Sequence, residues 1–293
     1  QASEAPTSSV RSRGVADFDE AVCAKVVRAL PRGGSPGAFG LRYEHVKTWL
    51  PLDGSDTFPM ARFLFDICSG QILSDALGGL EIAKLFGFEK PGGGIRPVAV
   101  RSTWGRLAGK VLCELYKEQW AESVGPSQFA IGLPNGNEIL LKLAQTILDS
   151  DDPNSSDPIC LLQIDAKKAF NSCNREAFRT LLRQEYPELA PFVEQWYGHP
   201  TPLLFGAHTI MSRQGVQQGD PFGSFLFCLG LRPVLDNIVR RCQSVTVLAS
   251  SDDILLAVRA SQLAAVFRVA IEELAGYDLE VNLPKCHAYC PRQ

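Results

Sequence analysis

The acidic pair Asp252-Asp253 lies between two apolar arms of the segment Val245–Val258, and this segment constrains the fold more than any other. The arms VTVLA and ILLAV are rich in β-branched and aliphatic residues, which is typical of buried strands. The polar letters SSDD between them are short enough to form the turn of a β-hairpin. We therefore expect both carboxylates to stand at one end of a largely buried sheet.

A third acid, Asp165, ends another apolar run, ICLLQID. A buried strand that ends in Asp brings its carboxylate out at the end of the sheet, where it can face the hairpin turn. Three carboxylates in one place repel one another and raise their pKa values unless cations neutralise them. Oxygen ligands suit Mg²⁺ or Mn²⁺, and two such ions about 4 Å apart promote phosphoryl transfer. Because Asp is also common in tight turns, a purely conformational role remains the alternative.

The rest of the sequence alternates helical and strand patterns. Apolar residues recur every three or four positions in six segments, which predicts helices at Phe18–Leu30, Trp104–Leu115, Ile139–Ile147, Phe178–Leu182, Phe225–Val239 and Leu263–Leu274. Strands are expected at 159–165, in both arms of the hairpin, and at LEVNL, residues 279–283. A mostly helical first half followed by mixed elements predicts an α+β fold in which helices back a sheet.

Charge and hydropathy narrow the class of function. The net charge is −3, which argues weakly against nucleic-acid binding. Between Glu81 and Lys110, however, six basic residues stand against two acidic ones, a local balance of +4 that a solvated helix face would also produce. No apolar run approaches the roughly 20 residues of a membrane helix, so we expect no membrane span.

Cysteine usage and the first residues bear on the compartment. The nine cysteines are scattered and mostly lie in apolar runs, which favours buried free thiols in a reducing, intracellular compartment over a disulfide framework. Cys286, His287 and Cys290 are zinc-ligand types, but a structural zinc site needs further ligands. Residues 1–14 lack the apolar region of a secretory signal and are expected to be a disordered lead-in.

Seven segments follow one another in a specific order along the chain. They are RGGSPGAFGLRYEHVK, EKPGGGIRPVAV, QFAIGLPNGNE, QIDAKKAFNSCNR, WYGHPTPLLF with SRQGVQQGDPFGSFLF, LASSDDILLAV and LEVNLPKC. In this order, from about Pro31 to Cys286, they resemble the reverse transcriptases of non-LTR (LINE-type) retrotransposons. The resemblance implies a right-hand polymerase, with fingers in residues 15–150 partly interleaved with the palm, an antiparallel palm sheet in residues 151–293, and no thumb.

The resemblance also implies roles for the acids. Asp165 and Asp252 would ligate two Mg²⁺ or Mn²⁺ ions, Asp253 would be a neighbouring acid that tunes the site, and the backbone carbonyl of Ala166 would complete a metal shell. Lys285 matches a lysine that protonates the departing pyrophosphate as a general acid. A surface lysine is the alternative for that position.

Five residues match positions that bind the incoming nucleotide. Arg96 and Lys90 would contact the triphosphate, since a guanidinium offers paired donors and an ammonium a point charge. Phe170 would lie beneath the sugar and leave a 2′-hydroxyl neither space nor partner. Gln218 and Gly219 would press on the template–nucleotide pair. The alternative for Arg96 and Lys90 is that the glycine-rich segment beside them only closes a hairpin. The alternative for Phe170 is a core aromatic, and that for Gln218 and Gly219 is the start of a helix.

The implied function is an RNA-directed DNA polymerase that extends a primer 3′-hydroxyl with a deoxynucleoside triphosphate. Its partners would be an RNA template, a DNA primer and the dNTP, and its location the nucleus or cytoplasm. The thumb and endonuclease of a retrotransposon protein are expected to be missing from this chain.

Two departures from the family pattern keep a second hypothesis open. Ser250 replaces an aromatic that packs against the primer end, and Lys168 replaces a polar neutral residue. An inactive or domesticated domain that only binds nucleic acid is the alternative, and Ser250 and the acidic net charge motivate it. An RNA-templated RNA polymerase is a more distant alternative, which Phe170 opposes.

Overall fold

The computed structural model describes residues 15, 18–72, 74–91 and 93–291. The expected lead-in, residues 1–14, lies outside the described residues. The helices are α1 (Glu20–Ala29), α2 (Tyr43–Lys47), α3 (Ala61–Cys68), α4 (Ser74–Glu81), α5 (Thr103–Ser123), α6 (Gly136–Asp149), α7 (Ala169–Ser172), α8 (Arg175–Glu185), α9 (Ala190–Tyr197), α10 (Gly223–Arg241) and α11 (Leu263–Ala275), with 3₁₀ turns η2 (Pro187–Leu189), η3 (Ala260–Gln262) and η4 (Leu283–Lys285). The strands are β1 (Ala83–Glu89), β2 (Ile95–Val100), β3 (Ile159–Ile164), β4 (Thr201–Phe205), β5 (His208–Ser212), β6 (Thr246–Ser250), β7 (Asp253–Arg259) and β8 (His287–Tyr289).

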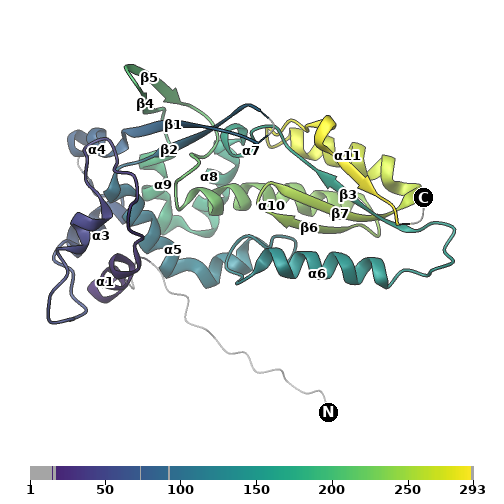
Figure 1. Cartoon of the computed structure of the whole chain (residues 1–293), viewed down its shortest axis with the longest axis horizontal. Coiled ribbons are helices and arrows are strands. Elements are labelled where there is room, and N and C mark those ends of the chain that lie inside the picture. Colours follow the sequence, from purple (N-terminus) through teal and green to yellow (C-terminus); the bar gives the residue numbers. More distant parts are fainter. Residues whose placement is uncertain (1–14, 16–17, 73, 92, 292–293) are drawn as a thin grey trace, which may run out of the picture.

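These strands form two four-stranded sheets. The first, the hairpin sheet, has the order β2-β1-β4-β5; β1 and β4 are parallel and the other pairs antiparallel. The second, the carboxylate sheet, has the order β6-β7-β3-β8 and is antiparallel throughout. Figure 1 shows α1 and α3 at one end of an elongated molecule and the carboxylate sheet toward the other. The predicted mixture of helices with an antiparallel sheet is confirmed.

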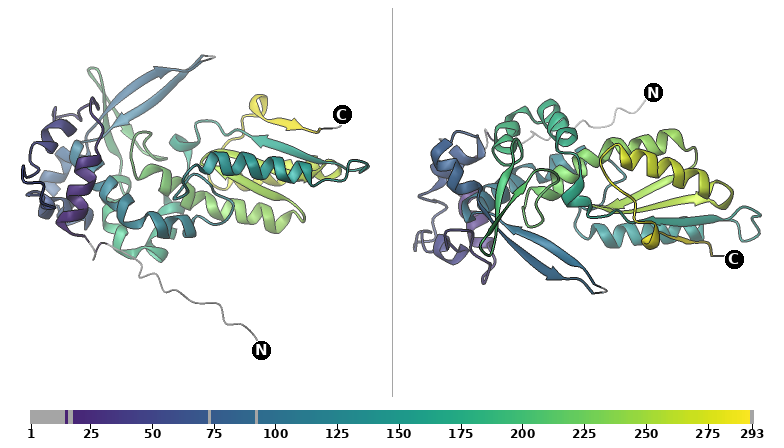
Figure 2. Two further views of the ribbon diagram at one scale, coloured as in Figure 1. Left: turned by 60° about the horizontal axis from the view of Figure 1, so that its bottom comes forward. Right: turned by 90° about the horizontal axis from the view of Figure 1, so that it is seen from above.

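Helices cover both faces of the carboxylate sheet, as the views in Figures 1 and 2 show. On one face, Leu140 of α6 packs in a small apolar cluster with Leu248 of β6 and Leu255 of β7. On the other face, Leu162 of β3 and Leu256 of β7 join the main core, to which α10 and α11 also contribute. Side chains alternate between the faces along each strand, so apolar side chains are buried on both faces of the sheet.

The six predicted helices correspond to α1, α5, α6, α8, α10 and α11, and the first, Phe18–Leu30, extends beyond α1 at both ends. Local sequence explains their limits. The carboxylate of Asp19 accepts a hydrogen bond from Val22 N (2.7 Å) and caps α1, which ends before Pro31. The hydroxyl of Ser102 accepts from Gly105 N (3.2 Å) and caps α5 in the same way. Among the described residues, no helix combines the length and apolar character needed to cross a membrane.

One predicted strand is wrong. Residues 279–283 make only an isolated bridge, between Val281 and Ala166, and the strand that completes the sheet is β8, further along. The main chain of Asn282 turns away to bind Asp165, and Pro284 has no N–H to continue a ladder. The apolar and β-branched letters of LEVNL therefore mark a connection that crosses the end of the sheet.

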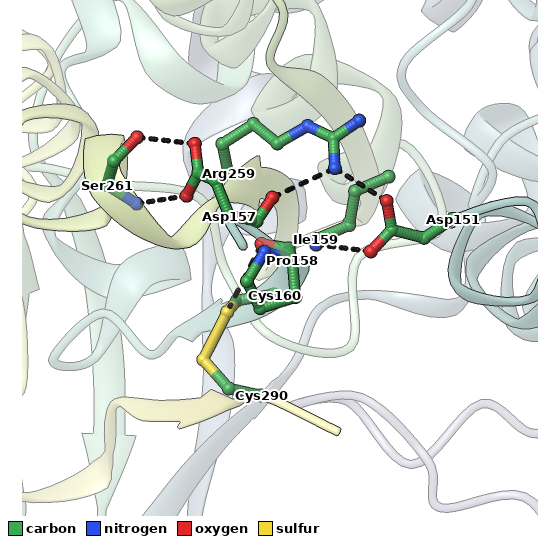
Figure 3. Close-up of a disulfide and its surroundings, with 8 residues drawn as sticks. All are labelled: Asp151, Asp157, Pro158, Ile159, Cys160, Arg259, Ser261 and Cys290. Carbon is green, nitrogen blue, oxygen red and sulfur yellow. Dashed lines mark hydrogen bonds and ion pairs between the residues drawn. A yellow bond between two sulfur atoms is a disulfide. The ribbon is translucent and has the colours of Figure 1, made fainter. Parts of the chain in front are cut away.

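The preference for free thiols over disulfides, predicted from the sequence, is wrong for one pair of cysteines. Cys160 of β3 and Cys290, just beyond β8, form a disulfide across 130 sequence positions (Figure 3). The register of the two antiparallel strands pairs Leu161 with Tyr289, so the next step brings the two cysteines opposite each other. The other seven cysteines are free. The disulfide also removes Cys290 from the considered zinc cluster.

Polar contacts surround the disulfide at the same end of the sheet, named here the closed end (Figure 3). Arg259 Nη1 contacts Asp151 Oδ1 (2.5 Å) and donates to the carbonyl of Asp157 (3.0 Å). The second carboxylate oxygen of Asp151 accepts from Ile159 N (2.9 Å). The carboxylate of Asp157 accepts from Ser261 N (2.8 Å) and Oγ (2.7 Å). Both acids of the closed end therefore have donors.

Candidate active site

Three carboxylates gather at the opposite end of the carboxylate sheet, named here the open end. Asp165 directly follows β3, and Asp253 is the first residue of β7. These antiparallel strands pair Ile164 with Ile254, so Asp165 and Asp253 each adjoin the last pair of the ladder, at the same end of the sheet. Asp252 lies in the two-residue turn between β6 and β7. The structure thus brings together the three acids that the sequence singled out.

Burial and neighbouring negative charge at the open end affect the pKa of Asp252. Burial raises the pKa of its carboxyl above the usual value, and the neighbouring charges of Asp253 and Asp165 raise it further. The guanidinium of Arg96, on β2 of the hairpin sheet, opposes these effects and lowers it. A charge on the hairpin sheet therefore acts on Asp252 of the carboxylate sheet.

Asp165 is held by a residue that the sequence argument did not single out. Asn282 Nδ2 donates to Asp165 Oδ2 (2.7 Å), and Asn282 N donates to the carbonyl of Asp165 (2.8 Å). The neighbouring residue Val281 forms an isolated antiparallel β-bridge with Ala166, the residue that follows Asp165. Ala166 is half-buried. Asn282 lies inside LEVNLPKC, but only the folded chain assigns it to this carboxylate.

The remaining cationic candidates are Lys90 and Lys285. Lys90 is half-buried at the turn of the β1–β2 hairpin, where its main chain exchanges hydrogen bonds with Gly93 and Gly94 (both 3.0 Å). Lys285 is exposed on η4. In the described part of the chain, neither ammonium forms an ion pair. Among the predicted cationic residues, Arg96 has a charge that lowers the pKa of Asp252.

Phe170 rests on α10. Its ring stacks on Phe227 with centroids 4.6 Å apart and an interplanar angle of 11°. Its carbonyl accepts from Val216 N (2.6 Å), which joins α7 to the loop before α10. At Gly215, φ is +65°, and an added Cβ would lie 2.4 Å from the same carbonyl, so only glycine allows this approach. One face of the Phe170 ring is packed and the side chain is only half-buried.

The same loop reaches the hairpin sheet at Gln218 and Gly219. The carbonyl of Gln218 accepts from Ala99 N (2.8 Å) on β2, three residues beyond Arg96. Gly219 has φ +105°, and a Cβ there would lie 2.7 Å from Ala99 O. This loop therefore connects Phe170 on one side with the arginine-bearing strand on the other.

A buried ion pair anchors that loop. It also uses one of the basic residues that the sequence counted toward the local excess of positive charge between positions 81 and 110. Arg101 Nη2 lies 3.2 Å from Asp220 Oδ2, and both side chains are 2% exposed. Tyr197 OH donates to the same carboxylate oxygen (2.5 Å). Arg106 is also buried, with its guanidinium over the ring of Tyr43. Two of the six basic residues between positions 81 and 110 are therefore structural, and the basic surface there is smaller than the sequence suggests.

Ser250, the most notable departure from the family pattern, has a partner. Its hydroxyl donates to Asn137 Oδ1 (2.5 Å) at the start of α6. These two residues, with Leu141, Gln163 and Asp253 among others, line a cavity of about 400 Å³ beside the acids. The polar substitution is thus built into the hairpin rather than left without a hydrogen bond.

The donor set at the open end suits a hard divalent cation. Three carboxylates share one end of the sheet, and crowding raises the pKa of one of them, which a cation would reverse. Within the described residues, no three His, Cys, Asp or Glu side chains converge as a ready-made metal cage. Mg²⁺ sites that work on phosphates commonly use one or two carboxylates and take the remaining ligands from water and substrate, so the residues fit.

Comparison with known proteins agrees with this geometry. Residues 88–293, which include all three acids and Arg96, match the family described as reverse transcriptase (RNA-dependent DNA polymerase). The chain belongs to the reverse transcriptase family. Reverse transcriptases use divalent metal ions and act on nucleic acid and deoxynucleoside triphosphates, which is consistent with the carboxylates gathered here.

A relative extends the match toward the start of the chain. The retrotransposable element SLACS 132 kDa protein of Trypanosoma brucei gambiense is 24% identical over 294 residues, which cover 96% of this chain. The same alignment covers 24% of the trypanosome protein, so this reverse transcriptase chain spans about a quarter of that relative. The predicted resemblance to reverse transcriptases is confirmed.

Proposed function

We propose that the chain is the fingers and palm of an RNA-directed DNA polymerase from a non-LTR retrotransposon. Its reaction is attack of a primer 3′-hydroxyl on the α-phosphate of a dNTP, with release of pyrophosphate. The observation that carries the proposal is the convergence of Asp165, Asp252 and Asp253 at one sheet end, with Arg96 from a different sheet within electrostatic reach.

In this proposal Asp165 and Asp252 hold two Mg²⁺ or Mn²⁺ ions, with Ala166 contributing its carbonyl oxygen. Bound there, the ions would lower the pKa of the attacking hydroxyl and neutralise charge on the phosphates. Asp253 adds negative charge that favours cation binding. Asn282, which donates to Asp165, restricts that carboxylate to one orientation and leaves its other oxygen available.

The nucleotide would lie against the surface that the loop before α10 and the hairpin sheet form together. Arg96 and Lys90 bind its triphosphate, and the contact of Gln218 and Gly219 with β2 supports their placement against the template–nucleotide pair. Phe170, packed on α10, lies beneath the sugar and excludes a 2′-hydroxyl. That role opposes the alternative of an RNA-templated RNA polymerase.

Lys285 is proposed as the general acid that protonates pyrophosphate. Its exposed position on η4 requires the side chain to reach the leaving group after nucleotide binds. The four-carbon stem of lysine makes such a movement inexpensive. Of the proposed roles, that of Lys285 depends most on a change of side-chain position when the nucleotide binds.

The proposed fingers, residues 15–150, and palm, residues 151–293, are interleaved in space. Strands β4 and β5 extend the sheet begun by β1 and β2, and α6 packs on the carboxylate sheet. The partners are an RNA template, a DNA primer and dNTPs. We propose that the thumb and endonuclease belong to other parts of the longer protein.

The proposal is tested by primer extension on an RNA template with Mg²⁺ and either dNTPs or rNTPs. We expect extension with dNTPs, little with rNTPs, and none by Asp252→Asn. A wild-type protein that binds primer–template but does not extend it contradicts the proposal and supports the inactive, nucleic-acid-binding alternative. Equal use of both nucleotide types contradicts the role of Phe170 and supports an RNA polymerase.

A further inference from the structure

A short segment far from the acids in sequence runs along the free edge of the carboxylate sheet. Phe129 N donates to the carbonyl of Ala249 on β6 (2.7 Å), and Ala249 N donates to the carbonyl of Ser127 (2.7 Å). Gln128 and Ala249 form a parallel bridge. Since β6 is the edge strand, the segment acts as a short additional strand and places Gln128 beside the acidic turn.

The side chain of Gln128 binds that turn at both peptide groups of one residue. Gln128 is 2% exposed. Its Oε1 accepts from Ser251 N (2.7 Å) and from Ala130 N (3.2 Å), and its Nε2 donates to the carbonyl of Ser251 (3.4 Å). That carbonyl belongs to the peptide that joins Ser251 to Asp252. Both amide atoms of Gln128 therefore act on the backbone that directs the Asp252 side chain.

Ser251 needs such support because its backbone conformation is unfavourable. Its φ is +55°, in the left-handed region that costs free energy for a residue with a Cβ, whereas Asp252 is not among the residues with positive φ. A positive φ at the first turn residue only is the pattern of a type II′ turn, which prefers glycine at that position. The sequence places serine there, and Gln128 supplies hydrogen bonds that hold the conformation.

The backbone at Gln128 is itself fixed. Phe129 is buried in one cluster with Leu140 of α6 and Leu248 of β6. At Gly136, an added Cβ would lie 1.8 Å from the carbonyl of Phe129, so α6 begins directly against this segment. Because its backbone is held on both sides, Gln128 can transmit that rigidity to the turn.

We infer that Gln128 is a positioning residue that sets the orientation of Asp252 for metal binding by holding Ser251 in its left-handed conformation. The inference rests on the proposed function and deepens it. Glutamine suits the role because it offers one acceptor and one donor without charge. Glutamate would lack the donor and add a fourth negative charge to the site, and lysine would lack the acceptor.

The test is Mn²⁺ binding by the full chain, measured by calorimetry without nucleic acid. The part of the binding that Asp252→Asn abolishes defines the site. We expect Gln128→Met to weaken that part about 10-fold, as loss of an outer-shell hydrogen bond does at other metal sites. Gln195→Met is the matched control: Gln195 is also buried and donates to Ile67 O (3.0 Å), away from the acids. We expect it to bind Mn²⁺ as wild type does.

A second substitution tests the route of the effect. Ser251→Gly in the Gln128→Met protein should recover most of the lost affinity, because glycine adopts the turn conformation without support. Gln128→Asn, which keeps an amide but is one methylene too short to reach Ser251, should weaken binding similarly and serves if the methionine variant does not fold.

The outcomes separate the inference from the function on which it rests. Unchanged Mn²⁺ affinity in both Gln128 variants overturns the inference and leaves the metal site standing. Weakened affinity without rescue by Ser251→Gly overturns the turn mechanism. A wild-type protein without Asp252-dependent Mn²⁺ binding overturns the proposed metal site and the inference together.

Discussion

The two ends of the carboxylate sheet have similar acids in opposite circumstances. At the closed end, Asp151 pairs with Arg259, and hydrogen bonds from Ser261 hold the pKa of Asp157 below its usual value. At the open end, burial and neighbouring acids raise the pKa of Asp252. The closed end stabilises its negative charge within the protein, whereas the open end leaves charge for something else to neutralise. That asymmetry, more than the number of acids, marks the functional end.

The largest expected effect is on catalysis, from a change at the open end only. Asp252→Asn keeps the size of the side chain and removes one charged metal ligand, so we expect the rate of primer extension to fall at least about 100-fold. Asp157→Asn makes the same chemical change at the closed end and should leave the rate unchanged. Equal losses in the two variants, measured under saturating Mg²⁺, would mean that the two ends do not differ in function.

The open end was largely predictable from sequence because its signal is local. The apolar arms around Asp252-Asp253 and the apolar run before Asp165 fix strands, and strands fix where their end residues emerge. The contact between Asn282 and Asp165 spans 117 positions and depends on how a connection crosses the sheet end. No local pattern of propensity or periodicity encodes such a contact.

The closed end was not predictable from sequence, because its contacts join residues that are far apart along the chain. The pairing of Cys160 with Cys290 follows from the register of β3 with β8, but the strand was expected at residues 279–283 instead. With the strand misplaced, the two cysteines had no reason to meet. Arg101 shows a related limit, since charge counting assigned to the surface a guanidinium that pairs with buried Asp220.

The second largest effect is on stability, at the closed end. Cys160→Ser opens a loop closed across 130 positions, and we expect a loss of about 2–4 kcal/mol in the free energy of unfolding under oxidising conditions. Denaturant unfolding with and without reductant measures it. Under reducing conditions the variant and wild type should differ much less, and primer extension should survive reduction. A loss of activity on reduction would show that the two ends are coupled.

A smaller loss is expected from the ion pair beside the disulfide. The side chain of Asp151 is 4% exposed and that of Arg259 is 40% exposed, so Asp151→Asn leaves a cation that water can partly solvate. We expect about 1–3 kcal/mol of destabilisation, from the charge-assisted bonds lost. A double-mutant cycle with Arg259→Gln isolates the pair. Additive losses would show that the two side chains do not stabilise each other.

The smallest expected effect is on the pH dependence of stability. Substitutions at the two ends of the sheet should shift the melting temperature in opposite directions. A carboxyl with a raised folded-state pKa contributes stability at pH below its unfolded value, and this is lost as pH rises through the folded pKa. Without divalent ions, Asp252→Asn should therefore raise the melting temperature at neutral pH and have little effect in acid. Asp157 has a lowered pKa, so its contribution is present above the unfolded value and lost on acidification. Asp157→Asn should therefore lower the melting temperature at neutral pH, and the two variants should approach wild type together as pH falls.

Added Mg²⁺ should stabilise wild type more than Asp252→Asn, because only the wild-type open end offers the ion its full charge. If Asp252→Asn is instead less stable than wild type in metal-free neutral buffer, the negative charge at the open end is already compensated by the protein, and the contrast between the two ends fails.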